Sequence, residues 1–139
     1  MNSLSSEITS QADCILVVDD LADNSFLLQT VLESEGYKVE VAASGQAALD
    51  KIAEHPPELV LLDVMMPQMN GFEVTRQIRQ NPLIPFIPIL LVTGYSGLMP
   101  AEGFDAGADG FVRKPIDFEH LLNQIKAILQ PRHLIDPLM

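Results

Sequence analysis

The sequence Leu59-Val60-Leu61-Leu62-Asp63 places an acidic residue directly after a run of aliphatic ones, and Ile89-Leu90-Leu91-Val92-Thr93 does the same with a hydroxyl residue. Neither run alternates between apolar and polar residues. Uninterrupted apolar runs of this length are typical of strands buried on both faces, as in a parallel sheet covered by helices. The two runs therefore predict an α/β fold.

Strand-sized apolar runs and stretches with helical spacing alternate along the chain. We expect strands at 14–18, 38–42, 59–62, 87–92 and 110–112. We expect helices between Asp23 and Gly36, at about 46–54, 72–80 and 98–106, and between Asp117 and Pro131. Asp23 and Asp117 are of a type preferred at helix N-caps, and Gly36 is of the type preferred just after a helix. Pro100 and Gly103 weaken the segment 98–106, which we expect to be short and mobile.

This alternation predicts the topology of the domain. Five strands that alternate with five helices predict a (βα)₅ domain with a doubly wound, five-stranded parallel sheet of the flavodoxin-like type. The strand order 2-1-3-4-5 is the commonest one for such a sheet. We expect the domain at residues 14–130, with a polar flank at 1–13 and a C-terminal tail at 131–139.

The composition limits the partners that this domain can have. The chain has 139 residues and a formal net charge of −11, with 8 Lys and Arg against 19 Asp and Glu. Such a surface repels the phosphates of nucleic acids and of anionic membranes. No apolar run approaches the roughly 18 residues of a membrane-spanning helix, and the single cysteine, Cys14, allows no internal disulfide. We therefore expect a cytoplasmic protein that binds neither nucleic acid nor membrane.

Acidic residues gather where this topology provides a binding crevice. In an open α/β sheet, ligands bind beyond the carboxyl ends of the strands where the strand order reverses, which is here between the first and third strands. Asp19 and Asp20 follow the first strand and Asp63 ends the third. Two unit charges 4 Å apart repel each other by roughly 4 kcal/mol at an effective dielectric constant of 20, so a proton or a cation must relieve the cluster. A ligand set made only of oxygen atoms suits Mg²⁺.

Two further side chains at the same sheet edge point to phosphoryl chemistry. Thr93 ends the fourth strand and Lys114 follows the fifth. A metal ion, a hydroxyl and an ammonium group together can hold the three oxygens of a phosphoryl group in transfer. A carboxylate can itself accept that group and become an aspartyl phosphate.

At these residues the chain resembles the receiver domains of two-component response regulators, and among them the stand-alone receivers of the chemotaxis type. The resemblance extends over about 14–130 and rests on motifs in the family's order: Ile15-Leu16-Val17-Val18-Asp19-Asp20, Leu61-Leu62-Asp63-Val64-Met65-Met66-Pro67, Met69-Asn70-Gly71, Pro88-Ile89-Leu90-Leu91-Val92-Thr93, Gly107-Ala108 and Lys114-Pro115. It implies that Asp63 accepts a phosphoryl group from a sensor histidine kinase or a phosphotransfer protein.

The resemblance also implies a metal site. Asp20, Asp63 and the backbone carbonyl of Met65 would bind Mg²⁺, for which Mn²⁺ could substitute, and Asp19 would act through a bound water. Lys114 would pair with the aspartyl phosphate, aimed inward by a cis bond to the following proline.

In the family, phosphorylation is transmitted by a switch, and the resemblance implies its residues here. Thr93 would be drawn toward the phosphorylated aspartate and Phe111 would rotate into the vacated space, which remodels the surface formed by the last two predicted helices and the last strand. Met65 and Tyr95 occupy the positions that tune the lifetime of the aspartyl phosphate. Because both are bulky and have an apolar body, we expect slow dephosphorylation.

A stand-alone receiver is a phosphorylation-switched binding module, and we expect no enzymatic activity beyond its own phosphorylation and dephosphorylation. Its signal would pass to an unknown downstream protein or through a self-dimer. That dimer would use either the surface of the last two helices and the last strand or the tail at 131–139, which contains Leu134, Ile135, Leu138 and Met139.

Three other functions fit the same fold. A metal-dependent phosphatase with an aspartate nucleophile needs a second acid in an Asp-x-Asp pattern, which Asp19-Asp20-Leu21-Ala22 does not supply. A flavodoxin-like carrier of FMN needs a first loop of Ser, Thr and Gly to hold the phosphate, whereas this loop is acidic. A pseudo-receiver with a purely structural role is disfavoured because every expected site residue is present.

Overall fold

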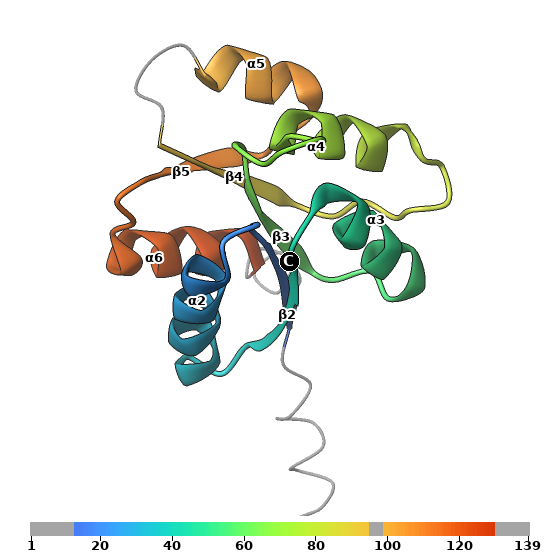
Figure 1. The fold of residues 1–139 in the computed structure, drawn as a ribbon. Coiled ribbons are helices and arrows are strands. Elements are labelled where there is room, and N and C mark those ends of the chain that lie inside the picture. The colour runs from blue at the N-terminus through green and yellow to red at the C-terminus, as the bar shows by residue number, and fades with distance from the viewer. Residues whose placement is uncertain (1–12, 95–98, 130–139) are drawn as a thin grey trace, which may run out of the picture.

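The computed structural model describes residues 13–94 and 99–129, which form one five-stranded parallel sheet (Figure 1). The strands are β1 (Cys14–Val18), β2 (Lys38–Ala42), β3 (Leu59–Asp63), β4 (Ile89–Thr93) and β5 (Gly110–Arg113). Their order is β2-β1-β3-β4-β5, and every neighbouring pair is parallel. The predicted fold class and strand order are confirmed.

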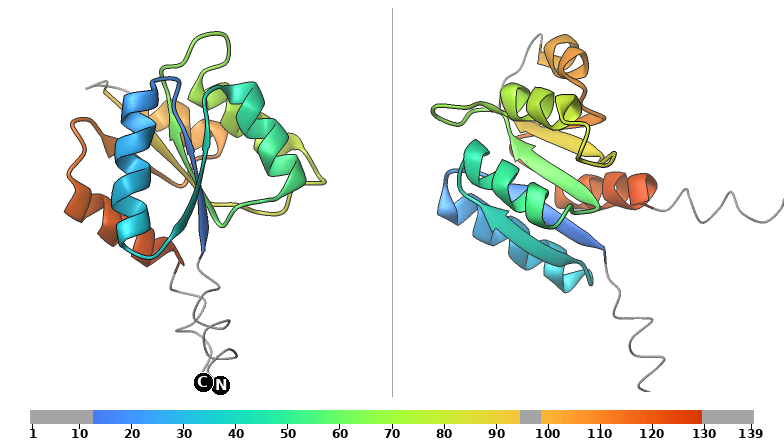
Figure 2. Two further views of the ribbon diagram at one scale, coloured as in Figure 1. Left: turned by 60° about the horizontal axis from the view of Figure 1, so that its bottom comes forward. Right: turned by 90° about the vertical axis from the view of Figure 1, so that its right-hand side faces the viewer.

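Five helices cover the two faces of the described sheet. They are α2 (Ala22–Ser34), α3 (Gly45–Glu54), α4 (Gly71–Gln80), α5 (Met99–Ala106) and α6 (Phe118–Leu129). Helices α2 and α6 lie on one face, and α3, α4 and α5 lie on the other (Figures 1 and 2). None of the helices within 13–94 and 99–129 is long and apolar enough to cross a membrane.

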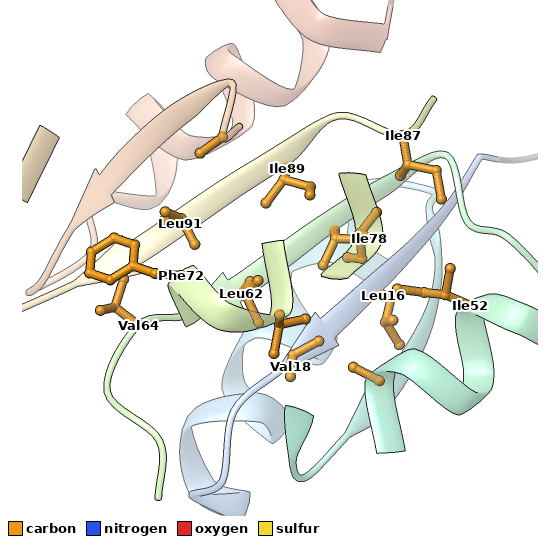
Figure 3. Packing of buried hydrophobic residues seen from close by; sticks show 14 of the residues in the cluster. Leu16, Val18, Ile52, Leu62, Val64, Phe72, Ile78, Ile87, Ile89 and Leu91 are labelled. Atoms are coloured by element: carbon orange, nitrogen blue, oxygen red, sulfur yellow. The ribbon is translucent and has the colours of Figure 1, made fainter. Parts of the chain in front are cut away.

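The continuous apolar runs of β3 and β4 exist because both faces of each strand are covered. Successive side chains of a strand point to opposite faces, so Leu62 and Leu91 belong to the core under α3, α4 and α5 (Figure 3). Leu61 and Val92 belong to the separate core under α2 and α6. All five residues of each strand are buried, as the sequence pattern predicted.

Helix ends follow the predicted signals in most places. Gly36 has φ = 97° just after α2, and its N–H donates to the carbonyl of Glu33 while that of Tyr37 donates to Leu32. This pair of bonds is a Schellman motif, which closes the helix. At the start of α6, the Asp117 carboxylate accepts the N–H of His120 at 3.2 Å, as expected of an N-cap.

The prediction that Asp23 caps α2 is wrong. The helix begins at Ala22, its N-cap position is Leu21, and no side chain caps it. The carbonyl of Leu21 already accepts the N–H groups of Asn24 and Ser25, so the helix starts before Asp23 can act as a cap. Asp23 lies in the first turn instead, where a negative charge is favourable near the helix N-terminus.

Candidate functional site

Three carboxylates meet at the carboxyl end of the sheet. β1 and β3 are neighbours with Val18 opposite Leu62, so the residues that follow them lie side by side. One carboxylate oxygen each from Asp19, Asp20 and Asp63 lies within 4.8 Å of the others. Asp19 and Asp63 are each 4% exposed, and Asp20 is half-buried. The predicted convergence of these acids is confirmed.

Backbone amides hold two of the carboxylates in place. The N–H of Leu21 donates to Oδ1 of Asp19 at 2.9 Å, and the N–H of Met65 donates to Oδ1 of Asp63 at 3.3 Å. Both bonds join a carboxylate to the amide two residues later, which is the Asx-turn arrangement. The acids are therefore oriented by the loops that follow their own strands.

Gly71 determines the path of the loop after Asp63. Its N–H donates to the carbonyl of Val64 at 2.9 Å, and a Cβ atom on Gly71 would lie only 2.7 Å from the carbonyl oxygen of Asp63. Only glycine permits this close approach of two backbones. The sequence contained Gly71 in a family motif, but its positioning role became clear only from the contact.

The environment of the Asp63 carboxyl disfavours its charged form. The pKa of the Asp63 carboxyl is raised above its ordinary value of 3.8, chiefly by burial and then by the charge of Asp19. Lys114 opposes these effects, since its Nζ lies 3.5 Å from Oδ1 of Asp63. One ammonium group faces three acids, so the cluster keeps an excess of negative charge.

Thr93 ends β4, and Lys114 directly follows the neighbouring strand β5, as predicted. The backbone N–H of Lys114 donates to the carbonyl of Thr93 at 2.9 Å, which ties the loop after β5 to the end of β4. The bond between Lys114 and Pro115 is cis, in agreement with the resemblance. Thr93 is 2% exposed. The structure therefore brings the ammonium group to Asp63 and buries the threonine at the end of the adjacent strand.

Phe111 connects β5 to α5. Its ring is half-buried and stacks edge to face against Phe104, with 5.0 Å between ring centroids and 85° between planes. A Cβ atom on Gly103 would collide with the ring of Phe111. The glycine that weakened the predicted helix at 98–106 is thus required by packing. The predicted mobility of that helix stays untested.

The structure describes only one of the two residues that we expect to tune the lifetime of the aspartyl phosphate. Met65 is 58% exposed, and its backbone N–H donates to Asp63. Tyr95 lies outside the described residues.

An apolar cavity adjoins the carboxylates, and sequence reasoning did not find it. It has a volume of about 280 Å³, and residues of α2 and of the β5–α6 loop line it together with the strands. Its lining residues are Val18, Asp19, Asn24, Leu27, Leu28, Leu61, Asp63, Val92, Lys114, Pro115, Ile116 and Phe118. No short-range sequence signal could have revealed it, since the lining comes from five separate segments.

The donor set of the cluster fits Mg²⁺. The three carboxylates offer oxygen atoms only. Mg²⁺ prefers such hard ligands, binds through one or two carboxylates, and keeps several waters that phosphate oxygens can replace.

The chain is similar to known signalling proteins. The sequence model of the response regulator receiver domain matches residues 15–126. Response regulator PleD of Caulobacter vibrioides is 39% identical over 125 residues, which cover 89% of this chain and 28% of PleD. Response regulator ArlR of Staphylococcus saprophyticus is 40% identical over 126 residues, which cover 88% of this chain and 56% of ArlR.

The fold of this chain is also similar to solved structures of response regulators. Chemotaxis protein CheY4 of Vibrio cholerae has a TM-score of 0.80 at 34% identity, with 85% of this chain and 99% of CheY4 covered. A response regulator described as putative from Chloroflexus aurantiacus has a TM-score of 0.81 at 34% identity, with 85% and 98% covered. The chain spans between about a quarter and just over half of the curated relatives named above.

Proposed function

This chain belongs to the response regulator receiver domain family, and on that premise we propose that Asp63 accepts a phosphoryl group from a phosphohistidine of a sensor kinase or phosphotransfer protein. One observation carries the proposal. Asp63 ends β3 within 4.8 Å of two other acids and with the Lys114 ammonium 3.5 Å away. A nucleophilic carboxylate, oxygen ligands for a cation and a fixed positive charge thus share one crevice.

In the proposed reaction, an Asp63 carboxylate oxygen attacks the phosphorus atom. The P–O bond forms, the P–N bond to the histidine breaks, and the imidazole nitrogen keeps the electron pair and takes up a proton. Bound Mg²⁺ would neutralise charge on the phosphoryl oxygens. Asp19, Asp20, Asp63 and the carbonyl of Met65 would hold it.

Lys114 and Thr93 have different proposed roles. Lys114 holds a positive charge 3.5 Å from the accepting carboxylate, where it would pair with the phosphoryl oxygens that Asp63 receives. Thr93 donates its hydroxyl to the aspartyl phosphate. The bond between the Lys114 N–H and the Thr93 carbonyl keeps these two residues in register.

We propose that the signal leaves through α5, β5 and α6. Phe111 fills the space beside Gly103 and touches Phe104, so a rotation of its ring requires α5 to repack. That contact supports a role of Phe111 in transmitting the signal to α5, and we propose Thr93 as its partner in the switch. The remodelled face would bind a downstream protein in the cytoplasm or a second copy of the chain. A dimer contact through 131–139 concerns residues outside the described part.

Met65 is proposed to slow dephosphorylation. Its backbone N–H donates to the Asp63 carboxylate at 3.3 Å and its side chain is largely exposed, so the apolar side chain would hinder the approach of water to the phosphorus atom.

Receiver domains are signalling modules. A protein of Vibrio cholerae named "Probable cyclic di-GMP phosphodiesterase" is 38% identical to this chain, but the similarity covers only 31% of that protein. We therefore propose no phosphodiesterase activity for this chain.

The experiment that tests the proposal is labelling by a small phosphodonor in the presence of Mg²⁺. Wild type should be labelled, Asp63→Asn should not, and Asp50→Asn should behave as wild type because Asp50 is an exposed acid on α3. Undiminished labelling of Asp63→Asn would remove Asp63 from its proposed role.

A further inference from the structure

A second concave surface lies at the opposite end of the sheet from the carboxylates. It has a volume of about 410 Å³ and is lined by Pro56, Pro57, Glu58, Pro85, Phe86, Ile87, Pro88 and Ile128. We name it the base groove. Its lining residues precede β3 and β4 or belong to the last turn of α6, whereas the acids follow β1 and β3. The base groove is therefore separate from the proposed phosphorylation site.

The chemistry of the base groove suits an apolar segment. Proline has no backbone N–H, so its four proline residues offer no donor to a polar ligand. Phe86 is 72% exposed although its side chain is large and apolar. Burying such a side chain is favourable, so Phe86 and the prolines beside it offer a surface for an apolar segment.

Phe86 is held in position before anything binds. The Arg79 guanidinium carbon lies 4.8 Å from the centroid of the Phe86 ring. That guanidinium is itself fixed, because it donates to the carbonyls of Gly107 at 2.9 Å and Ile87 at 2.8 Å and to the Asp109 carboxylate at 2.9 Å. A surface built from prolines and an anchored aromatic ring loses little conformational entropy on binding.

The segment that follows α6 has the composition and the reach to occupy the base groove. Residues 130–139 lie outside the described part, and their sequence contains Leu134, Ile135, Leu138 and Met139. Ile128, which lines the groove, precedes Leu134 by six residues. Six residues span at most about 20 Å, so the chain is long enough for Leu134 and the residues after it to reach the groove. We propose that residues 134–139 of the same chain bind in the base groove against Phe86.

A double-mutant cycle in the full chain tests this proposal. Phe86→Ser removes the anchor, and Leu134→Ser with Ile135→Ser removes the apolar side chains of the segment. Each change should lower the urea midpoint by roughly 0.5 to 1 M, as expected for the loss of one or two buried apolar groups. Their combination should lower it no further than the larger single effect, because both remove the same contact.

Leu83→Ser is the matched control for the cycle. Leu83 belongs to the same loop and is 89% exposed, but it does not line the groove. Leu83→Ser should leave the urea midpoint unchanged. Combined with the segment variant, it should give the same midpoint as the segment variant alone. Additive effects of Phe86→Ser and the segment variant would overturn the proposal.

A direct contact measurement completes the test. With the methyl groups of isoleucine labelled, a nuclear Overhauser effect should join the Phe86 ring to the Ile135 methyl group at low protein concentration. A contact that appears only between differently labelled copies, together with dimers in size-exclusion chromatography, would overturn the intrachain docking. All of these readouts are independent of phosphorylation, so failure here leaves the role of Asp63 untouched.

Discussion

Replacing Asp19 by asparagine should stabilise the protein in the absence of divalent cations. The variant keeps an oxygen that can accept the N–H of Leu21, now bonded at 2.9 Å, and removes only the charge. The Asp19 and Asp63 oxygens lie within 4.8 Å of each other. At that distance two unit charges repel by about 0.9 kcal/mol in water and about 3.5 kcal/mol at an effective dielectric constant of 20.

Because both carboxylates are 4% exposed, the gain should lie between these two values. We expect the free energy of unfolding to rise by about 1 to 3 kcal/mol in EDTA, which raises Tm by roughly 3 to 10 °C. In Mg²⁺, wild type should become the more stable of the two proteins. It binds Mg²⁺ more tightly than Asp19→Asn does, and a ligand that binds only the folded state stabilises the tighter binder more. Wild type should gain more from Mg²⁺ than Asp19→Asn does.

Thermal unfolding with and without Mg²⁺ measures both effects, and Asp50→Asn serves as the control for the loss of an exposed charge. The reasoning is refuted if Asp19→Asn matches Asp50→Asn in EDTA. Equal stabilisation of Asp19→Asn and wild type by Mg²⁺ would refute it as well.

Three further predictions follow from the same site and its neighbours. The pKa of Asp63 is raised in the folded state, so its contribution to stability is present below pH 3.8 and is lost as the pH rises through the raised pKa. Urea unfolding at a series of pH values in EDTA should show this loss for wild type and not for Asp63→Asn. Gly71→Ala should lower the free energy of unfolding by about 1 to 3 kcal/mol and weaken Mg²⁺ binding in calorimetry, because the new methyl group would displace the backbone of Asp63; unchanged values would contradict the proposed contact. Gly103→Ala should destabilise the protein because the new methyl group meets the Phe111 ring, although alanine favours a helix over glycine by about 1 kcal/mol. Adding Phe111→Ala to this variant should remove the destabilisation. A Gly103→Ala protein that is more stable than wild type would show that the contact with the Phe111 ring is not tight.

The strands and the acidic cluster could be predicted because their signals are local. An aliphatic run that ends in Asp63 identifies both a buried strand and a side chain at its carboxyl end. The topological rule for open α/β sheets then places Asp19 and Asp20 beside it. Neither step needs the details of side-chain packing.

Other features depend on contacts between distant segments, so the sequence could not show them. Gly103 reads as a helix breaker until the ring of Phe111 is placed against it. The cavity beside the carboxylates and the base groove are each lined by several separate segments.

The measurement that tests the central claim most directly is the location of the acyl phosphate. After reaction with a small phosphodonor, borohydride reduces an aspartyl phosphate to homoserine, and mass spectrometry of peptides finds the position. Homoserine should appear at position 63 when Mg²⁺ is present and should vanish when EDTA replaces it. Homoserine at another aspartate, or equal conversion at position 63 in EDTA, would contradict a cation-dependent phosphorylation site at Asp63.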